Sequence, residues 1–361
     1  MLRNFFALLV FSVSVLCADV ASPFSMTIRE TLSVLPRSSP EKITTEQLGY
    51  WDKVAQTLTE KEQPGDALRM LVYLYSAQKA FADNSFIITG AYSGSLDPIS
   101  EKTLQLFYPD FKSAKKITED PFSLALTKEL FKHVQDRFDA ESKNIHPVSE
   151  KSGEQFWKGE APYDGMNLPS MQPWMIKVEN FGVAAPSEDK MFWQDQLQKV
   201  EKAHDQMTER QKERVLFWAG KTGVGSGDWC SIVNKYMEEH QVPLEKRLEV
   251  REKLACAMFD ATVAVYTAKY QNWIKRPVML DPQLKTVVPT PNHPSFPSAH
   301  STIGAAVAVV LDYYLPENKQ QWDQLAEEAG LSRIWGGIHF PIDHEAGKKL
   351  GQKVGETIIE N

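Results

Sequence analysis

The sequence predicts an all-α protein, a bundle of helices without a major sheet. Apolar residues recur at helical spacing along most of the 361-residue chain, while the two-residue alternation typical of half-buried strands is scarce. Hydrophobic residues make up 42% of the chain and charged residues 24%, which are ordinary values for a globular protein. Collagen, a continuous coiled coil and wholesale disorder are therefore excluded.

The first 22 residues have the pattern of a secretory signal peptide. Arg3 precedes an apolar run over residues 5–16, and small residues follow from Cys17 to Ser22. The run is too short to span a bilayer, which needs about 20 apolar residues. We therefore expect cleavage between Cys17 and Ser22 and a secreted or periplasmic protein. The alternatives are an N-terminal anchoring helix and a lipid anchor on Cys17.

Two helical regions and an irregular segment are expected next. Apolar residues have helical spacing over residues 45–84 and again over 121–143, and a loop rich in glycine, serine and proline lies between them near 90–99. Residues 144–188 lose this spacing and carry recurrent prolines among large aromatic side chains. Such a composition predicts a belt packed over helices rather than a disordered linker.

The second half of the chain is expected to consist mainly of helices. They cover residues 189–219, 229–240, 243–275 (as one helix or two), 298–315, 317–329 and 343 to the C-terminus. Pro277 stops the third of these, and residues 278–296 form a proline-rich loop. We divide the mature chain into an N-terminal helical region over residues 23–185, which includes the belt, and a helical catalytic core over residues 186–361.

Net charge and cysteine content limit the classes of function. The formal net charge of −7 argues against nucleic-acid binding, which needs a basic surface, although a local basic pocket can still bind a small anion. No stretch after the signal peptide is long and apolar enough to span a membrane, so we expect none in the mature form. Cys230 and Cys256 either pair in an oxidising compartment or remain buried thiols.

Three groups of polar residues occur in the last third of the chain. Lys269 and Arg276 form the first; they are two helical turns apart, so both project from one face of the helix. Arg333, His339 and Asp343 form the last. A guanidinium grips a tetrahedral oxyanion with two parallel hydrogen bonds, and Asp343 either orients the His339 ring or caps the final helix. Taken alone, Lys269 and Arg276 are as typical of a solvated basic face.

The middle group lies at the start of the apolar helix expected from residue 298. Ser298 occupies the N-cap, where the unpaired amides of the first turn, including that of Ala299, can bind an anion. His300 in the same turn reaches that anion. His293 lies across a short, stiff turn from it and is expected at the mouth of the same pocket. The alternatives are an ordinary serine cap, a partly buried His300, and a His293 that is bonded to the backbone.

In their order and spacing, these groups resemble the three-part signature of the type 2 phosphatidic acid phosphatase (PAP2) and vanadium haloperoxidase superfamily. The matching residues are Lys269, Arg276, Pro277, Pro297, Ser298, Ala299, His300, Ser332, Arg333, His339 and Asp343. Ala299 stands where the family usually has glycine, and its amide still reaches an oxyanion if its φ is negative. The resemblance extends from about residue 155 onward. Over that range the chain is most similar to bacterial secreted haloperoxidase-like proteins, and His293 before the motif at residues 297–300 is most similar to the bromoperoxidase branch.

The resemblance implies an all-α bundle of the PAP2/vanadium haloperoxidase type and an exported enzyme that binds an oxyanion. The anion-binding residues are then Lys269, Arg276, Ser298, Ala299 and Arg333. The catalytic residues are His300 as general acid–base, Asp343 as the partner of His339, and His339 itself, with His293 beside them.

Two chemistries fit that site. In a vanadium-dependent haloperoxidase, His339 is the single protein ligand of vanadate, and hydrogen peroxide oxidises a halide. In an acid phosphatase, which needs no such cofactor, His339 attacks a phosphate monoester and becomes phosphohistidine. His293 and the long helical region favour the haloperoxidase. The third alternative is a binding protein that has no catalytic activity.

Overall fold

The computed structural model describes residues 39–60, 62–117, 120–220 and 229–361. Within them the regular structure is helical, and β-pairing is limited to one isolated bridge between Lys42 and Ser93. The predicted all-α fold is therefore confirmed. The expected signal peptide over residues 1–22 lies outside the described residues.

Twelve α-helices are assigned in the described part of the chain. Those of the first half are α1 (Thr45–Thr59), α2 (Pro64–Thr89), α3 (Asp97–Gln105) and α4 (Pro121–Asn144). Those of the second half are α5 (Lys190–Asp205), α6 (Glu209–Ala219), α7 (Trp229–Glu239), α8 (Leu244–Asn272), α9 (Pro277–Leu280), α10 (Ala299–Tyr314), α11 (Lys319–Trp335) and α12 (Pro341–Glu360). Three short 3-10 turns are η1 (Leu168–Ser170), η2 (Val178–Asn180) and η3 (Pro316–Asn318).

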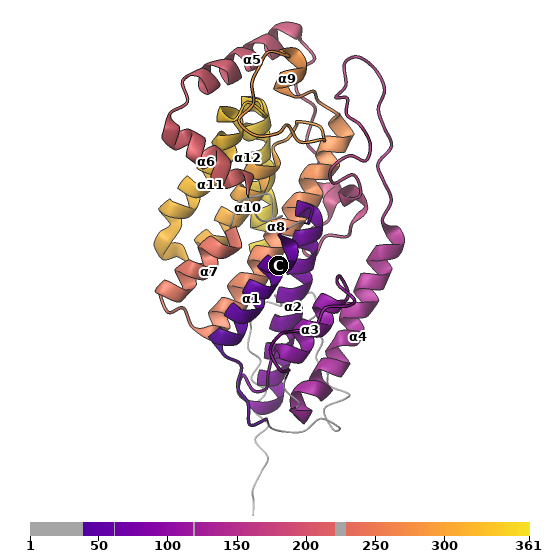
Figure 1. The fold of residues 1–361 in the computed structure, drawn as a ribbon, viewed down its shortest axis with the longest axis vertical. Helices are drawn as coiled ribbons and strands as arrows, with labels where there is room; N and C mark the ends of the chain where they lie inside the picture. Colours follow the sequence, from indigo (N-terminus) through magenta and orange to yellow (C-terminus); the bar gives the residue numbers. More distant parts are fainter. Residues whose placement is uncertain (1–38, 61, 118–119, 221–228) are drawn as a thin grey trace, which may run out of the picture.

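Helix α8 is the central element of the bundle. Helices α1–α4, coloured indigo to magenta in Figure 1, lie on one side of it, and α10 and α12 pack on the other. Nearly every side chain of α8 between Leu248 and Tyr270 is buried, as expected for a helix enclosed on all sides. The C-terminal end of α8 therefore carries Lys269 into the interior rather than into solvent.

The belt over residues 145–189 is irregular and packs on α8. Its aromatic side chains Trp157, Trp174 and Phe181 are buried. The carboxylate of Asp260 on α8 accepts hydrogen bonds from three successive belt amides, those of Trp174, Met175 and Ile176, at 2.7, 2.7 and 3.2 Å. A buried acidic side chain thus replaces the backbone pairing that an irregular segment cannot supply by itself.

Prolines account for several differences from the predicted boundaries. The helical region expected over residues 45–84 is two helices, and the second begins at Pro64. Pro277 stops α8 as expected but also begins the one-turn helix α9, because proline is favoured in a first helical turn. In the same way, α12 begins at Pro341, two residues before the expected start. Residues 243–275 hold a single long helix, α8.

Two further findings concern the cysteines and the membrane. Cys230 and Cys256 are buried thiols and form no disulfide in the described part of the chain. None of the described helices is both long and apolar enough to cross a membrane. The division of the chain between residues 185 and 186 remains a prediction.

Candidate active site

The three polar groups converge at one end of the helices, around a cavity of about 250 Å³. The site residues that line this cavity are His293, Ala299, His300, Arg333 and His339. The other four lie behind its wall, bonded to the segments that form it; they are Lys269, Arg276, Ser298 and Asp343. We refer to this space as the oxyanion cavity.

His339 is held in one orientation by Asp343. Its Nδ1 lies 2.8 Å from Oδ2 of Asp343, and the same oxygen accepts a 2.5 Å hydrogen bond from Ser295 Oγ and a 3.0 Å bond from the Phe340 amide. The carboxylate places the proton of the imidazole on Nδ1, so Nε2 carries the lone pair. Asp343 therefore both orients His339 and caps α12, which unites the two interpretations made from sequence.

Electrostatics keep the His339 ring neutral. Burial and the positive charges of Arg276 and Lys269 hold the pKa of His339 well below its usual range. Burial raises the pKa of Asp343, and the hydrogen bonds from Ser295 and Phe340 oppose that rise. A neutral imidazole with an available Nε2 has the form that a nucleophile or a metal ligand needs.

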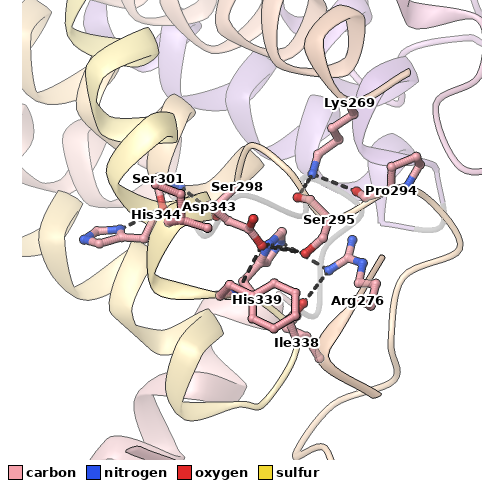
Figure 2. Close-up of polar contacts among 12 residues, drawn as sticks. Lys269, Arg276, Pro294, Ser295, Ser298, Ser301, Ile338, His339, Asp343 and His344 are labelled. Atoms are coloured by element: carbon pink, nitrogen blue, oxygen red, sulfur yellow. Dashed lines mark hydrogen bonds and ion pairs between the residues drawn. The ribbon is translucent and has the colours of Figure 1, made fainter. Parts of the chain in front are cut away.

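Lys269 and Arg276 bind the backbone of the loops that surround the cavity (Figure 2). Lys269 Nζ donates to the carbonyls of Pro294 and Ser295 at 3.0 and 2.6 Å. Arg276 donates to the carbonyls of His293 and Ile338 at 3.1 and 2.7 Å. Its Nη1 also lies 3.2 Å from Nε2 of His339. Each of the two cations thus holds two backbone carbonyls in place.

Arg333 is the cation that lines the cavity. It lies near the end of α11, which runs six residues beyond its expected end at 329. Its Nε donates to Ser332 Oγ at 2.9 Å and its Nη2 donates to the carbonyl of Val215. Nη1 has no partner among the described residues. Burial lowers the pKa of Arg333 to about 9, so the side chain is still charged near neutral pH and can bind an anion.

The start of α10 supplies the remaining groups. Ser298 caps the helix by accepting from the Ser301 amide, and its own amide donates 2.9 Å to the carbonyl of Asp343. Ala299 is the first helical residue and has a negative φ, so its amide remains available as the sequence requires. His300 Nε2 lies 2.8 Å from the Trp218 carbonyl. Burial and Arg333 lower the pKa of His300 to about 3.

His293 lines the cavity beside Arg276, where the sequence placed it. Its Nδ1 lies 3.0 Å from the Pro294 carbonyl and 3.1 Å from Arg276 Nη2. Its ring also contacts that of Tyr266, with centroids 5.1 Å apart. Burial, Lys269 and Arg276 together keep the pKa of His293 well below its usual range. Both environments expected for this histidine, the pocket wall and a backbone hydrogen bond, therefore occur together.

Sequence reasoning missed Ser295, Tyr266 and the segment around Trp218. Ser295 donates a hydrogen bond to Asp343. Its place in the sequence between the site residues His293 and His300 could have indicated that it belongs to the site. Tyr266 lies three residues before Lys269, one helical turn away on the same face of α8. Nothing in the local sequence indicates that carbonyls of α6 meet His300 and Arg333, because α6 lies 82 residues from His300 and 118 from Arg333.

A chain of polar side chains, buried except at Glu327, lies next to the site. Ser301 Oγ is 2.9 Å from Nδ1 of His344, and Nε2 of that ring is 3.2 Å from Glu327 Oε1. Ser301 follows His300 on α10, and His344 follows Asp343 on α12. Glu327 lies six positions before Arg333 on α11. The chain thus links the three helices that carry the site, and Figure 2 shows Ser301 and His344 beside Asp343, on the side away from Lys269 and Arg276.

Comparison with known proteins agrees with this geometry. The sequence profile of the PAP2 superfamily matches residues 254–353, the span from α8 to α12. We refer to residues 254–353, the part of the chain that this profile matches, as the PAP2 domain. They contain every signature position named from the sequence, so the resemblance is confirmed. Members of the superfamily are haloperoxidases and phosphatases, and the prediction of an enzyme is confirmed at that level.

Solved structures extend the likeness beyond the PAP2 domain. A bacterial vanadium-dependent iodoperoxidase has a TM-score of 0.70 and 18% identity, covering 90% of this chain and 98% of its own. A bacterial vanadium-dependent chloroperoxidase has a TM-score of 0.66 and 12% identity, covering 89% and 97%. At such identities the likeness establishes the fold, which here includes the helices that precede the PAP2 domain.

Among curated sequences, the bacitracin transport permease protein BcrC of Bacillus licheniformis is 37% identical over 57 residues. The alignment covers 16% of this chain and spans 28% of that protein's length.

Proposed function

We propose that the protein is a vanadium-dependent haloperoxidase that oxidises a halide with hydrogen peroxide. The observation that carries the proposal is His339. Asp343 holds its Nδ1, and the ring lines a small cavity together with Arg333, His300 and the start of α10. The two haloperoxidase structures support this proposal because they share the fold over nine-tenths of the chain, and His293 in the cavity wall supports it further.

The residues present fit vanadate. Vanadate is a tetrahedral oxyanion, and the cavity offers the neutral imidazole of His339, an arginine whose Nη1 has no partner in the described part of the chain, and helix-terminal amides. His339 would ligate the metal through Nε2, while Arg333 and the Ala299 amide would bind its oxygens. Bound vanadate supplies a Lewis-acid centre that activates hydrogen peroxide for the two-electron oxidation of a halide.

His300 is neutral in this cavity near pH 7, because its pKa is lowered to about 3. Its Nε2 donates to the Trp218 carbonyl, so Nδ1 carries the lone pair. The negative charge of bound vanadate would raise that pKa, and Nδ1 would then be a stronger base that takes a proton from hydrogen peroxide. A phosphatase would need His300 to gain a proton first, in order to protonate the leaving alcohol.

The test is a paired assay of the purified protein, with and without vanadate, for halide oxidation and for phosphomonoester hydrolysis. We expect halide oxidation that depends on vanadate and that His339→Ala abolishes, while phosphate binding weakens but persists through the cations. Ester hydrolysis without halide oxidation at any pH would establish the acid phosphatase instead. Phosphate binding with neither activity would identify a binding protein.

We also propose that the mature protein is secreted or periplasmic, exported by the signal peptide over residues 1–22. The charged start, the short apolar run and the small residues after it support this. N-terminal sequencing of the protein from the extracellular or periplasmic fraction tests it. A mature chain that still begins at Met1, found in the cytoplasm, would contradict the proposal.

A further inference from the structure

A second cavity of about 250 Å³ adjoins the oxyanion cavity. Gln63, Asp164 and Tyr266 line both of them, so the two cavities share a wall. The remaining walls of the second cavity come from the first turn of α2 and from belt residues 162–171. We call it the acidic cavity, because Asp66 and Asp164 line it and the described structure places no lysine, arginine or histidine in its wall.

The two carboxylates are only partly neutralised by the protein. Oδ2 of Asp164 accepts a 2.8 Å hydrogen bond from the Asn292 amide, and its Oδ1 has no partner among the described residues. Asp66 forms no ion pair in the described structure. Desolvation and the Glu62 carboxylate raise its pKa, and the charge of Arg69 offsets this only in part, although the residue remains exposed to solvent. The acidic cavity thus has a negative potential beside a cavity whose wall carries Arg333.

Tyr266 gives a second and independent indication of a ligand. The residue is only 8% exposed, and its hydroxyl has no hydrogen-bond partner within the described residues. Tyr266 lines both cavities, so its hydroxyl is available to a ligand there. The ring is also fixed in place, because it packs on His293 and because a Cβ at Gly165 would collide with it. Tyr266 therefore forms a rigid part of the wall that the two cavities share.

We propose that the acidic cavity binds the ammonium group of an organic ligand, beside the oxyanion cavity. Two carboxylates attract a cation, a tyrosine face attracts it through the ring quadrupole, and the thioethers of Met166 and Met171 suit its alkyl substituents. Opposite charges in adjoining cavities favour ligands that carry an amine next to the group that reacts or binds in the oxyanion cavity.

Only the role of the bound ligand rests on the proposed function. The binding of an ammonium group in the acidic cavity does not depend on it. Two sources can supply the same ammonium chemistry. One is an amine that receives the oxidised halide, and the other is the phosphate ester of an amino alcohol. Binding is measured without vanadate, peroxide or turnover, so it can succeed or fail independently of either enzymatic activity.

Isothermal titration calorimetry with choline tests the inference. The comparison ligand is 3,3-dimethylbutan-1-ol, which has the same shape but no charge. We expect saturable binding of choline and at least tenfold weaker binding of the alcohol. Asp66→Asn and Asp164→Asn should each weaken choline binding by about tenfold, and an asparagine at 164 can still accept from the Asn292 amide. Tyr266→Phe should weaken it less, because the ring remains.

The matched control is Asp110→Asn, which makes the same charge change at an exposed aspartate that lines neither cavity. It should bind choline as the wild type does. Equal affinity for choline and the alcohol would overturn the inference. So would wild-type affinity in both Asp66→Asn and Asp164→Asn, or no saturable choline binding. Phosphocholine that binds more than tenfold tighter than choline would identify the amino-alcohol phosphate as the source; no such gain would identify the free amine.

Discussion

The three cations serve different purposes within this one site. Lys269 and Arg276 bind the carbonyls of the surrounding loops, and Nη1 of Arg333 has no partner among the described residues. A guanidinium has five donors in a fixed plane, so Arg333 can hold the Val215 carbonyl and still bind an anion. Of the three, Arg333 is the one that lines the cavity.

Arg333→Ala should weaken binding of vanadate or phosphate more than Lys269→Ala does. The expected loss is about 10- to 100-fold, which corresponds to one or two charged hydrogen bonds of about 1.5–3 kcal/mol. Lys269→Ala should instead lower the free energy of unfolding, because two buried carbonyls lose their donor. Calorimetric titration with phosphate and urea unfolding of both variants measure the two effects. Near-wild-type affinity in Arg333→Ala would show that this residue does not bind the anion.

His293→Ala tests the choice between the two chemistries. His293 contacts Arg276 and lines the cavity, but it is not the ligand that Asp343 orients. If the protein is a haloperoxidase, the variant should still bind vanadate, while its rate of halide oxidation and the pH dependence of that rate change. Side-by-side pH–rate profiles with bromide measure this. Unchanged profiles would remove His293 from the reaction.

At the scale of elements, glycines allow α12 to approach α10 closely. Gly347, Gly351 and Gly355 recur at every fourth position on one face of α12. A Cβ at Gly347 would lie 2.7 Å from the Ser298 carbonyl oxygen, and one at Gly351 would collide with the carbonyl of Thr302. This contact sets the first turn of α12 against the first turn of α10, so it places Asp343 beside Ser298.

Gly351→Ala should therefore destabilise the protein by about 1–3 kcal/mol, the usual cost of overpacking a helix contact. The control is Gly49→Ala in α1, where a Cβ meets nothing within 4 Å; it should stabilise by about 0.5–1 kcal/mol through helix propensity. Urea unfolding measures both changes. Equal stability of the two variants would mean that α10 and α12 are not tightly packed at Gly351.

At the scale of the whole molecule, burial of the site makes stability depend on pH. The pKa values of His293, His300 and His339 are lowered in the folded state, whereas the same residues titrate near pH 6.5 when unfolded. Between about pH 7 and pH 5.5 the unfolded chain thus gains protons that these folded histidines do not. The raised pKa values of Asp260, about 6, and of Asp343 act in the opposite direction.

In this pH range the unfolded chain gains more protons at the three histidines than the folded chain gains at the two carboxyl groups. The free energy of unfolding should therefore fall as the pH falls. Each proton that is not offset contributes about 1.4 kcal/mol per pH unit, and we expect a net one to two protons. Urea unfolding at pH 7.0, 6.25 and 5.5 measures the slope. A His300→Gln variant should show a shallower slope, and stability that increases on acidification would contradict the assignment.

The sequence by itself determined the helices and the order of the three polar groups. Helical spacing, prolines at helix starts and the positions of Lys269, Ser298 and His339 are local properties, so they need no knowledge of packing. The tertiary structure decided which groups face the ligand. Arg276 meets the Ile338 carbonyl across 62 residues, and Tyr266 turns an unpaired hydroxyl toward a cavity whose acidic wall comes from α2 and the belt. Such partners depend on which distant segments pack together, because a donor binds the acceptor that folding brings within reach.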